Sequence, residues 1–200
     1  MIDPQPVTLE GYGVRLEPLE RSHRDALIAA AADGEVNKLW FAAVSELVPE
    51  SADGYIDSAL KGLSDGTMVP WVVRELQSGT IVGSTRYHDV VRQIDRVEIG
   101  YTFYSKPWQR THVNTACKLL LMTNAFEVVG CSVVGFRVDN LNPASQRAVE
   151  SMGARLDGVL RHFQARRDGS ARDTHFYSIL AAEWPAVKAR LEERLRRHGR

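Results

Sequence analysis

The sequence lacks the features that mark secreted, membrane-spanning or zinc-binding proteins. It holds two cysteines among 200 residues, too few for a disulfide framework, and no His/Cys cluster of the kind that binds zinc. No stretch approaches about 18 uncharged apolar residues, so no membrane span is expected. Residues 1–6 show no basic segment followed by an apolar run. We therefore expect no signal peptide, a soluble cytoplasmic protein and no metal.

An excess of charge of one sign is also missing. The 25 basic residues balance the 25 acidic ones, whereas domains that bind nucleic acid are usually basic, so no nucleic-acid partner is expected. The apolar fraction of 44% is enough for a full hydrophobic core. Two hundred residues fit one domain, which we expect to span residues 1–200.

Hydrophobic periodicity predicts a mixture of helices and strands. Helical spacing of apolar residues predicts helices over 22–33, 51–63, 114–128, 143–152 and 182–197. Alternation with period two predicts strands over 14–19, 68–75, 80–89, 96–103, 132–138, 156–165 and 173–180. Residues 35–41 are interpreted as a short helical piece or a loop. The expected fold class is α+β (mixed α/β), a twisted mixed sheet of about seven strands with flanking helices.

The stretch from Trp108 to Ala116 is the most informative part of the chain. It lies between a predicted strand and a predicted helix, where free backbone N–H groups converge and the helix dipole favours negative charge. The helix leads to another predicted strand, and a right-handed crossover places the two strands parallel. This arrangement predicts a ligand that carries phosphate groups.

Seven short landmarks surround that stretch and follow one another in a familiar order. They are Glu98–Tyr101, Tyr104–Gln109, Asn114–Lys118, Ala125–Glu127, Asp139–Asn140 with Ser145, Met152–Ala154, and Arg172–Thr174 with Tyr177–Ser178. Together they resemble the GNAT superfamily of acyl-CoA N-acyltransferases, and its ribosomal-protein (RimJ/RimL-like) branch in particular. The likeness covers roughly residues 10–185, and it implies central parallel strands that splay apart around the cofactor.

The resemblance implies an activity and its partners. The expected reaction moves an acetyl group from acetyl-CoA to a primary amine by direct attack in a ternary complex. The acceptor would be a protein N-terminus or a small molecule. Succinyl-CoA stays open as a donor because Arg161, Arg166 and Arg167 could pair with its carboxylate. A homodimer also stays open.

The same resemblance implies the residues that would hold the CoA phosphates and the pantetheine arm. They are Tyr101, Thr102, Phe103, Gln109, Arg110, Thr111, His112, Val113, Asn114, Thr115, Asn140 and Ser145. His112 and Asn114 stand where the family's phosphate loop carries small residues. His112 fits there with a negative φ and an outward side chain, and Asn114 can cap the helix. This departure supports an alternative, a CoA-binding sensor or interaction module without turnover.

Acyl transfer to an amine requires a neutral amine, a polarised carbonyl and a proton for the leaving thiolate. Glu98 is the first acid–base candidate, and its alternative role is a strand glutamate paired with Arg96 or Arg137. By resemblance, Ser145 would protonate the thiolate and Asp157 would act as the base. Their alternative roles are a first-turn helix hydrogen bond for Ser145 and a turn or bulge before a glycine for Asp157.

Several ring-bearing side chains are candidates for the acceptor side of the site. His88 ends the strand before the Glu98 strand, and it could line the acceptor cleft or be structural. Trp40, Phe41 and Tyr87 could shape the same wall by resemblance.

Overall fold

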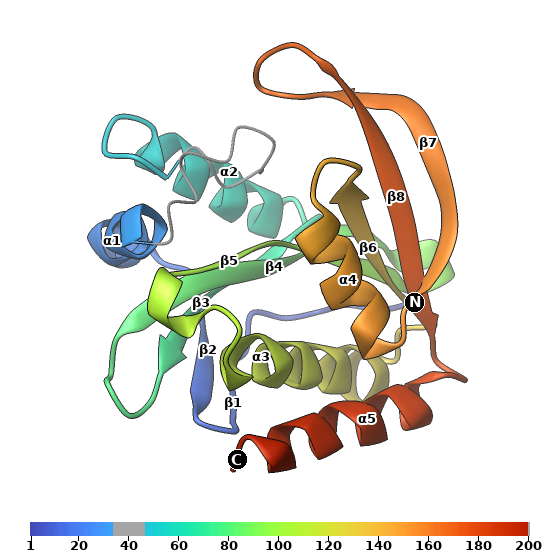
Figure 1. Ribbon diagram of the computed structural model, residues 1–200. Helices are drawn as coiled ribbons and strands as arrows, with labels where there is room; N and C mark the ends of the chain where they lie inside the picture. Colours follow the sequence, from blue (N-terminus) through green and yellow to red (C-terminus); the bar gives the residue numbers. More distant parts are fainter. Residues whose placement is uncertain (34–46, 200) are drawn as a thin grey trace.

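The computed structural model describes residues 1–33 and 47–199. In that part of the chain, eight strands form one sheet in the order β1-β2-β3-β4-β5-β6-β8-β7 (Figure 1). Their bounds are Leu9–Gly11 (β1), Val14–Pro18 (β2), Val69–Glu75 (β3), Ile81–Val91 (β4), Arg96–Tyr104 (β5), Val133–Asp139 (β6), Arg155–Ala165 (β7) and Ala171–Leu180 (β8). All seven predicted strands are present. The eighth, β1, is too short to show a period, and the left-handed turn residues Tyr12 and Gly13 fold it back onto β2.

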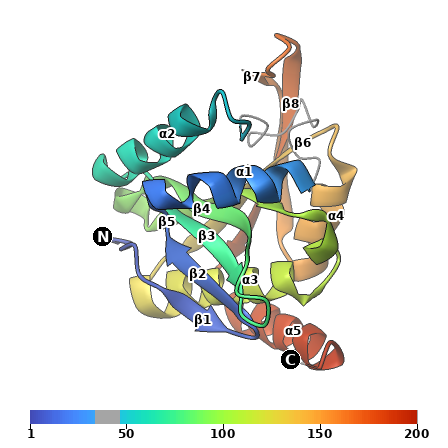
Figure 2. The same ribbon diagram turned by 90° about the vertical axis from the view of Figure 1, so that its left-hand side faces the viewer.

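Helices cover both faces of the sheet. On one face lie α1 (Arg24–Asp33), which follows a 3₁₀ turn, and α2 (Ala52–Ser64). The other face is covered by α3 (His112–Thr123) and α5 (Trp184–Arg197), as Figure 2 shows from the side. No helix in the described ranges is long and apolar enough to cross a membrane. The predicted helical piece or loop at 35–41 lies outside the described residues.

Each face of the sheet has its own apolar core. The larger core, under α3 and α5, contains the buried side chains of Trp71 and Leu121. The smaller core, under α1 and α2, contains Leu27 and Ile56. The two cores hold the strands rigidly on both sides, so the sheet can position a site at its centre.

Two helix N-termini are set by local side chains. α4 (Pro143–Met152) begins as expected, because Asn142 Oδ1 accepts the N–H of Ser145 at 3.0 Å and Pro143 takes the first position. α3 begins two residues earlier than predicted. Its cap is Thr111, whose Oγ1 accepts the N–H of Val113 at 3.3 Å.

The expectation that Asn114 caps α3 is therefore wrong. Asn114 is the third residue of α3, so it lies inside the first turn and not at the cap position. The far end of the predicted helix, 124–129, is a π-helical turn. Gly130 stops it with a left-handed φ of 80°.

The parallel strands β5 and β6 separate soon after they begin to pair. Three residue pairs join them, from Arg96↔Val133 to Glu98↔Gly135. Beyond that point Tyr101 takes a left-handed φ of 50°, and the β4–β5 register shifts by one residue. Such a bulge bends a strand and re-aims its backbone groups. The predicted splay of the central strands is thus confirmed.

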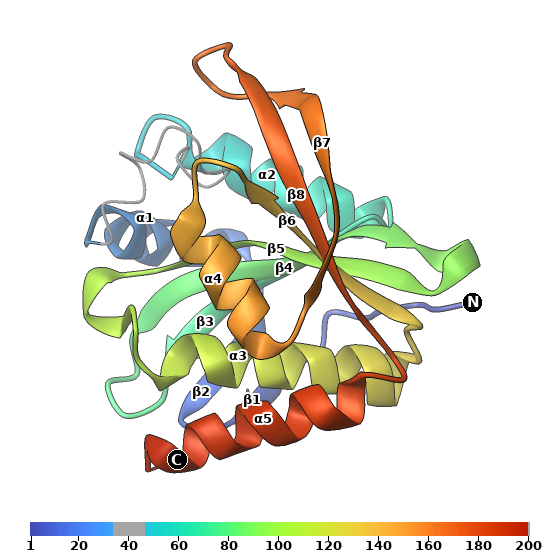
Figure 3. The same ribbon diagram turned by 45° about the vertical axis from the view of Figure 1, so that its right-hand side comes forward.

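β7 and β8 form a long hairpin that extends beyond the body of the sheet (Figure 3). β8 pairs antiparallel with β6 along the whole of β6, from Val133↔Leu180 to Asp139↔Thr174. β7 is the edge strand, and most of its side chains are exposed. β6 is therefore anchored on its β8 side and free on its β5 side once the two parallel strands part.

Candidate active site

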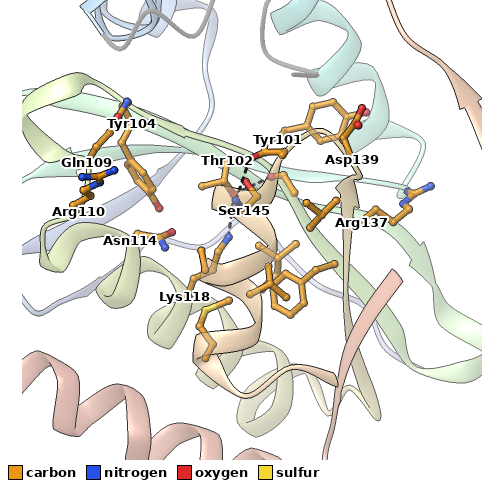
Figure 4. A pocket seen from close by; sticks show the side chains of 18 of the residues that line it. Tyr101, Thr102, Tyr104, Gln109, Arg110, Asn114, Lys118, Arg137, Asp139 and Ser145 are labelled. Atoms are coloured by element: carbon orange, nitrogen blue, oxygen red, sulfur yellow. Dashed lines mark hydrogen bonds between the residues drawn. The ribbon is translucent and has the colours of Figure 1, made fainter. Parts of the chain in front are cut away.

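A cavity of about 340 Å³ opens where β5 and β6 part. β5 supplies Gly100, Tyr101 and Thr102 to its wall, and β6 supplies the run from Phe136 to Asp139. The first two turns of α3 and one side of α4 along its length close the cavity, with Lys118 and Ser145 facing inward (Figure 4). Backbone groups of β5 that have no partner on β6 therefore border a hollow space.

The start of α3 forms one end of this cavity. Arg110 takes a left-handed φ of 60°, and Gln109 Nε2 donates to the carbonyl oxygen of Tyr104 at 2.9 Å, which braces the turn. His112 begins the helix without a positive φ, as expected, but its side chain is buried and does not turn outward. The expectation of an outward ring is wrong because the first turn of α3 directs this position into the protein. The N-terminal end of the α3 dipole lies at this end of the cavity, and its partial positive charge favours an anion.

The predicted cofactor residues fall into two groups. Six line the cavity: Tyr101, Thr102, Gln109, Arg110, Asn114 and Ser145. The other six, Phe103, Thr111, His112, Val113, Thr115 and Asn140, do not line it. Phe103 and Val113 belong to the apolar cores. A contact of these six with CoA would have to be made by backbone groups, and it stays a prediction.

Glu98 is buried at the last residue pair between β5 and β6. Its Oε1 accepts from Arg96 Nη2 and its Oε2 from Arg137 Nε, both at 2.6 Å. Burial raises the pKa of the Glu98 carboxyl, and the Arg96 guanidinium opposes that rise. This is the paired role that was the alternative for Glu98. The side chain does not line the cavity, and a catalytic role for it stays a prediction.

His88 pairs with Glu98 across β4 and β5. Its Nδ1 lies 2.6 Å from Asp89 Oδ2 and 3.1 Å from Arg137 Nη2. Its Nε2 lies over Gly100, where an added Cβ would come within 2.4 Å. Burial, and next the charge of Arg137, lower the pKa of His88 to about 3. The imidazole is therefore neutral at physiological pH. It packs against Gly100, just beyond the last residue pair between β5 and β6.

The same neighbourhood offers metal-type ligand atoms from His88, Asp89 and Glu98 within 4.8 Å of one another. Arg137 pairs with both carboxylates. A divalent cation would have to displace guanidinium groups that already neutralise these oxygens. The donor set therefore fits an arginine-centred ion network better than a resident metal.

The remaining catalytic candidates lie in different places. Ser145 is half-buried in the first turn of α4 and lines the cavity. Asp157 is exposed on β7, and its Oδ1 accepts from Ser178 Oγ at 2.9 Å. The β7–β8 register shifts at this point, between Leu156 and Gly158, so the bulge that was the alternative for Asp157 is confirmed. A role as base stays a prediction for Asp157.

The arginines that kept succinyl-CoA open do not line the cavity. Arg161 is exposed on β7, and Arg167 follows that strand in the hairpin turn. Arg166 binds the buried Asp139 through two hydrogen bonds of 2.8 and 3.0 Å. Among the described residues, the cationic side chains that line the cavity are Arg110, Lys118, Arg137 and Arg172.

Lys118 lines the cavity but was not among the predicted site residues. Its Nζ donates to Thr102 Oγ1 at 3.0 Å and lies 5.9 Å from the centroid of the Phe136 ring. Burial lowers the pKa of the Lys118 ammonium to about 8. A lysine inside an otherwise apolar helical run could have identified this position from the sequence, because lysine is rarely buried unless it is paired.

Comparisons with known proteins agree with this architecture. The acetyltransferase (GNAT) domain family matches residues 14–155. The uncharacterized N-acetyltransferase YoaA of Bacillus subtilis (strain 168) is 24% identical over 172 residues, which cover 86% of this chain and 96% of that protein. A solved protein from T. thermophilus, provisionally classed as an acetyltransferase, is 35% identical with a TM-score of 0.83, over 96% of this chain and 98% of that one.

A further likeness concerns the fold alone. Mycobacterium smegmatis RimJ, solved in complex with CoA-disulfide, is 20% identical with a TM-score of 0.79 over 94% of each chain. The family match spans most of the sheet and the whole of the cavity-forming segment from β5 to α4. The chain therefore belongs to the GNAT family of acetyltransferases.

Proposed function

We propose that this chain transfers an acetyl group from acetyl-CoA to a primary amine by direct attack in a ternary complex. One observation carries the proposal: the cavity joins the N-terminal end of α3 to the edge of β5 that has no partner on β6. An elongated ligand with phosphates at one end and amides along its length matches that combination. The other end of such a ligand would reach the point where the strands meet.

The residues present fit the chemistry of CoA. Arg110 and the first N–H groups of α3 offer positive charge to a pyrophosphate. The backbone of Tyr101 and Thr102 faces a gap, so its polar groups are free to bond the amides of a pantetheine arm. The RimJ structure, which contains CoA-disulfide on the same fold, supports this assignment.

Acetyl-CoA, when bound, supplies an activated acyl carbonyl and a thiol leaving group. The chain would orient the thioester along β5 and exclude water from it. The bulge at Tyr101 turns backbone groups of β5 into the cavity, where a developing negative charge on the carbonyl oxygen needs donors. Ser145 lines the cavity from α4 and offers a hydroxyl to the same space.

The paired state of Glu98 bears on the acceptor. Both oxygens of the Glu98 carboxylate accept from arginines, and the side chain does not line the cavity, so Glu98 is poorly placed to take a proton from an amine there. An α-amine, which titrates near ~7.7–8.0, is partly neutral at physiological pH, whereas a lysine amine near ~10.4 needs a base. We therefore favour an α-amine acceptor, such as a protein N-terminus or an amino compound of similar basicity.

Thiol release from acetyl-CoA across a panel of amines tests the proposal directly. We expect release with α-amino peptides and much less with Nα-blocked lysine peptides, at matched concentrations and about pH 7.5, close to the α-amine pKa. Calorimetric titration with CoA measures binding separately. Binding without release from any amine would favour the alternative of a CoA sensor, and the absence of both would refute the assignment.

A further inference from the structure

We propose that Lys118 is the acid that gives a proton to the CoA sulfur as the acyl group leaves. The assignment rests on the proposed function. It names a catalytic group at a position for which the family resemblance implied no catalytic role. The lysine's place in the cavity, its lack of a counter-ion and the character of its neighbours support it.

The side chain of Lys118 occupies the gap between the parted strands. It rises from the second turn of α3 and reaches Thr102 Oγ1 on β5, 3.0 Å from Nζ. The Phe136 ring on β6 lies 5.9 Å away on the opposite wall. Figure 4 shows the ammonium pointing between these two strands, close to Thr102 and below Ser145. A CoA arm that follows the unpaired edge of β5 would pass this ammonium.

Lys118 is a buried cation without a carboxylate partner among the residues that the structure describes. Its one hydrogen-bond acceptor is the Thr102 hydroxyl, which also bonds Thr85 Oγ1 at 2.8 Å. Removing an ammonium from water is costly unless charge or hydrogen bonds compensate for it. A ligand that develops negative charge beside Nζ would supply the missing compensation, and the departing thiolate of CoA is such a group.

The proton transfer balances without an added co-reactant. The amine nitrogen forms the new bond to the acyl carbon, the carbon–sulfur bond breaks, and its electron pair goes to sulfur. A proton moves from Lys118 Nζ to that sulfur, and CoA leaves as a neutral thiol. The proton that the amine loses on becoming an amide enters solvent, and the neutral lysine regains one from solvent. Because a thiol titrates near ~8.5 and burial lowers the pKa of Lys118 to about 8, the transfer is nearly thermoneutral.

No charged or titratable neighbour of Lys118 Nζ in the described residues is expected to change its charge near the pKa of the lysine. The charged and titratable neighbours, on α3 and on the strands that face it, are His88, Tyr104, Cys117, Arg137, Asp139 and Arg172. Burial raises the pKa of Cys117 to about 12 and holds that of Tyr104 well above its ordinary value. Arg166 keeps Asp139 ionised by lowering its pKa against the effect of burial. None of these groups is expected to change charge near the pKa of Lys118.

Two substitutions separate proton donation from charge alone. Lys118→Met keeps an unbranched side chain and removes the charge, so the fold should not lose stability, which thermal unfolding verifies. We expect its kcat to fall about 100-fold or more, the usual contribution of a general acid, while the Kd for acetyl-CoA changes less than about threefold. Lys118→Arg keeps the charge but holds its proton up to a pKa above ~12, and we expect a similar loss of kcat.

The pH profile and a matched control complete the test. In the wild type, kcat/KM should rise as the acceptor amine becomes neutral, near ~7.7–8.0, and fall again at higher pH as Lys118, with its pKa of about 8, loses its proton. Lys118→Met should lack that alkaline limb. Lys188→Met removes a surface lysine that pairs with Glu127, and should match the wild type. Full kcat in either Lys118 variant, or a retained alkaline limb in Lys118→Met, would overturn the assignment. A wild type that releases no thiol would instead overturn the proposed function.

Discussion

Replacing Glu98 with glutamine would decide between its two predicted roles. Glutamine has nearly the same size, but it removes the negative charge that lies between Arg96 and Arg137. Breaking a buried ion pair costs ~3–5 kcal/mol because the remaining charge is left uncompensated. Arg137 still contacts Asp89, whereas Arg96 has no second carboxylate in the described part of the chain. We therefore expect a loss of about 3 kcal/mol in the free energy of unfolding, the lower end of that range.

Urea unfolding followed by tryptophan fluorescence measures this loss. The matched control is Glu127→Gln, which removes one charge from a pair with Lys188 at the protein surface. Glu127 has a side-chain exposed fraction of 41%. An exposed pair is worth less than about 1 kcal/mol. The difference between the two variants isolates the effect of burial at Glu98 from the effect of losing a carboxylate.

Activity of the same variant tests the other role. If Glu98 only neutralises the two arginines, kcat measured well below the unfolding temperature should stay within about tenfold of the wild type. If Glu98 is the base, kcat should fall by ~10²–10⁴. A fall of that size, with an unfolding free energy within about 1 kcal/mol of the wild type, would refute the structural reasoning and restore Glu98 as the base.

Three further predictions use other positions. Gly100→Ala should lower the unfolding free energy by ~1–3 kcal/mol in urea titration, because its Cβ would come within 2.4 Å of His88 Nε2; an unchanged value would contradict that packing. Thr111→Ala should lower the unfolding free energy by ~0.5–2 kcal/mol through the lost cap, whereas Asn114→Ala should leave it nearly unchanged. A larger loss in Asn114→Ala than in Thr111→Ala would restore Asn114 as the cap. Burial raises the pKa of both cysteine thiols to about 12. A thiol reagent used near the ordinary thiol pKa of ~8.5 should therefore label the protein only after unfolding. Rapid labelling of the folded protein would contradict the burial of these thiols.

Local sequence determined much of the fold. The Asn142-Pro143 start of α4 and the Gly153 stop were readable because each depends on groups within a few residues of one another. Strands such as β3 and β4 were readable because their faces are buried, whereas most side chains of the predicted edge strand β7 are exposed. The start of α3 was misplaced by two residues, since an apolar period does not reveal that the Thr111 hydroxyl caps the helix.

Some features of the functional site were also predicted from sequence, whereas others depend on tertiary packing. An anion site at the turn before α3 was predicted from consecutive residues, whereas the cofactor residues on β5 were implied by the family resemblance. The burial of His112 could not be predicted from sequence alone. The pairing of Glu98 with Arg137, 39 residues away, was one of two roles that the sequence offered, and only packing decided in its favour. The contact of Lys118 with Thr102, 16 residues away, also depends on how α3 packs against the sheet.

The sequence by itself thus determined the order of most elements, the turn between β5 and α3, and the family. Only the tertiary structure decided which charged groups neutralise one another and which remain unpaired in the cavity. The physical reason is that helix and strand periods depend on neighbouring residues, whereas the protonation and reactivity of Glu98, His88 and Lys118 depend on burial and on charges brought close by packing.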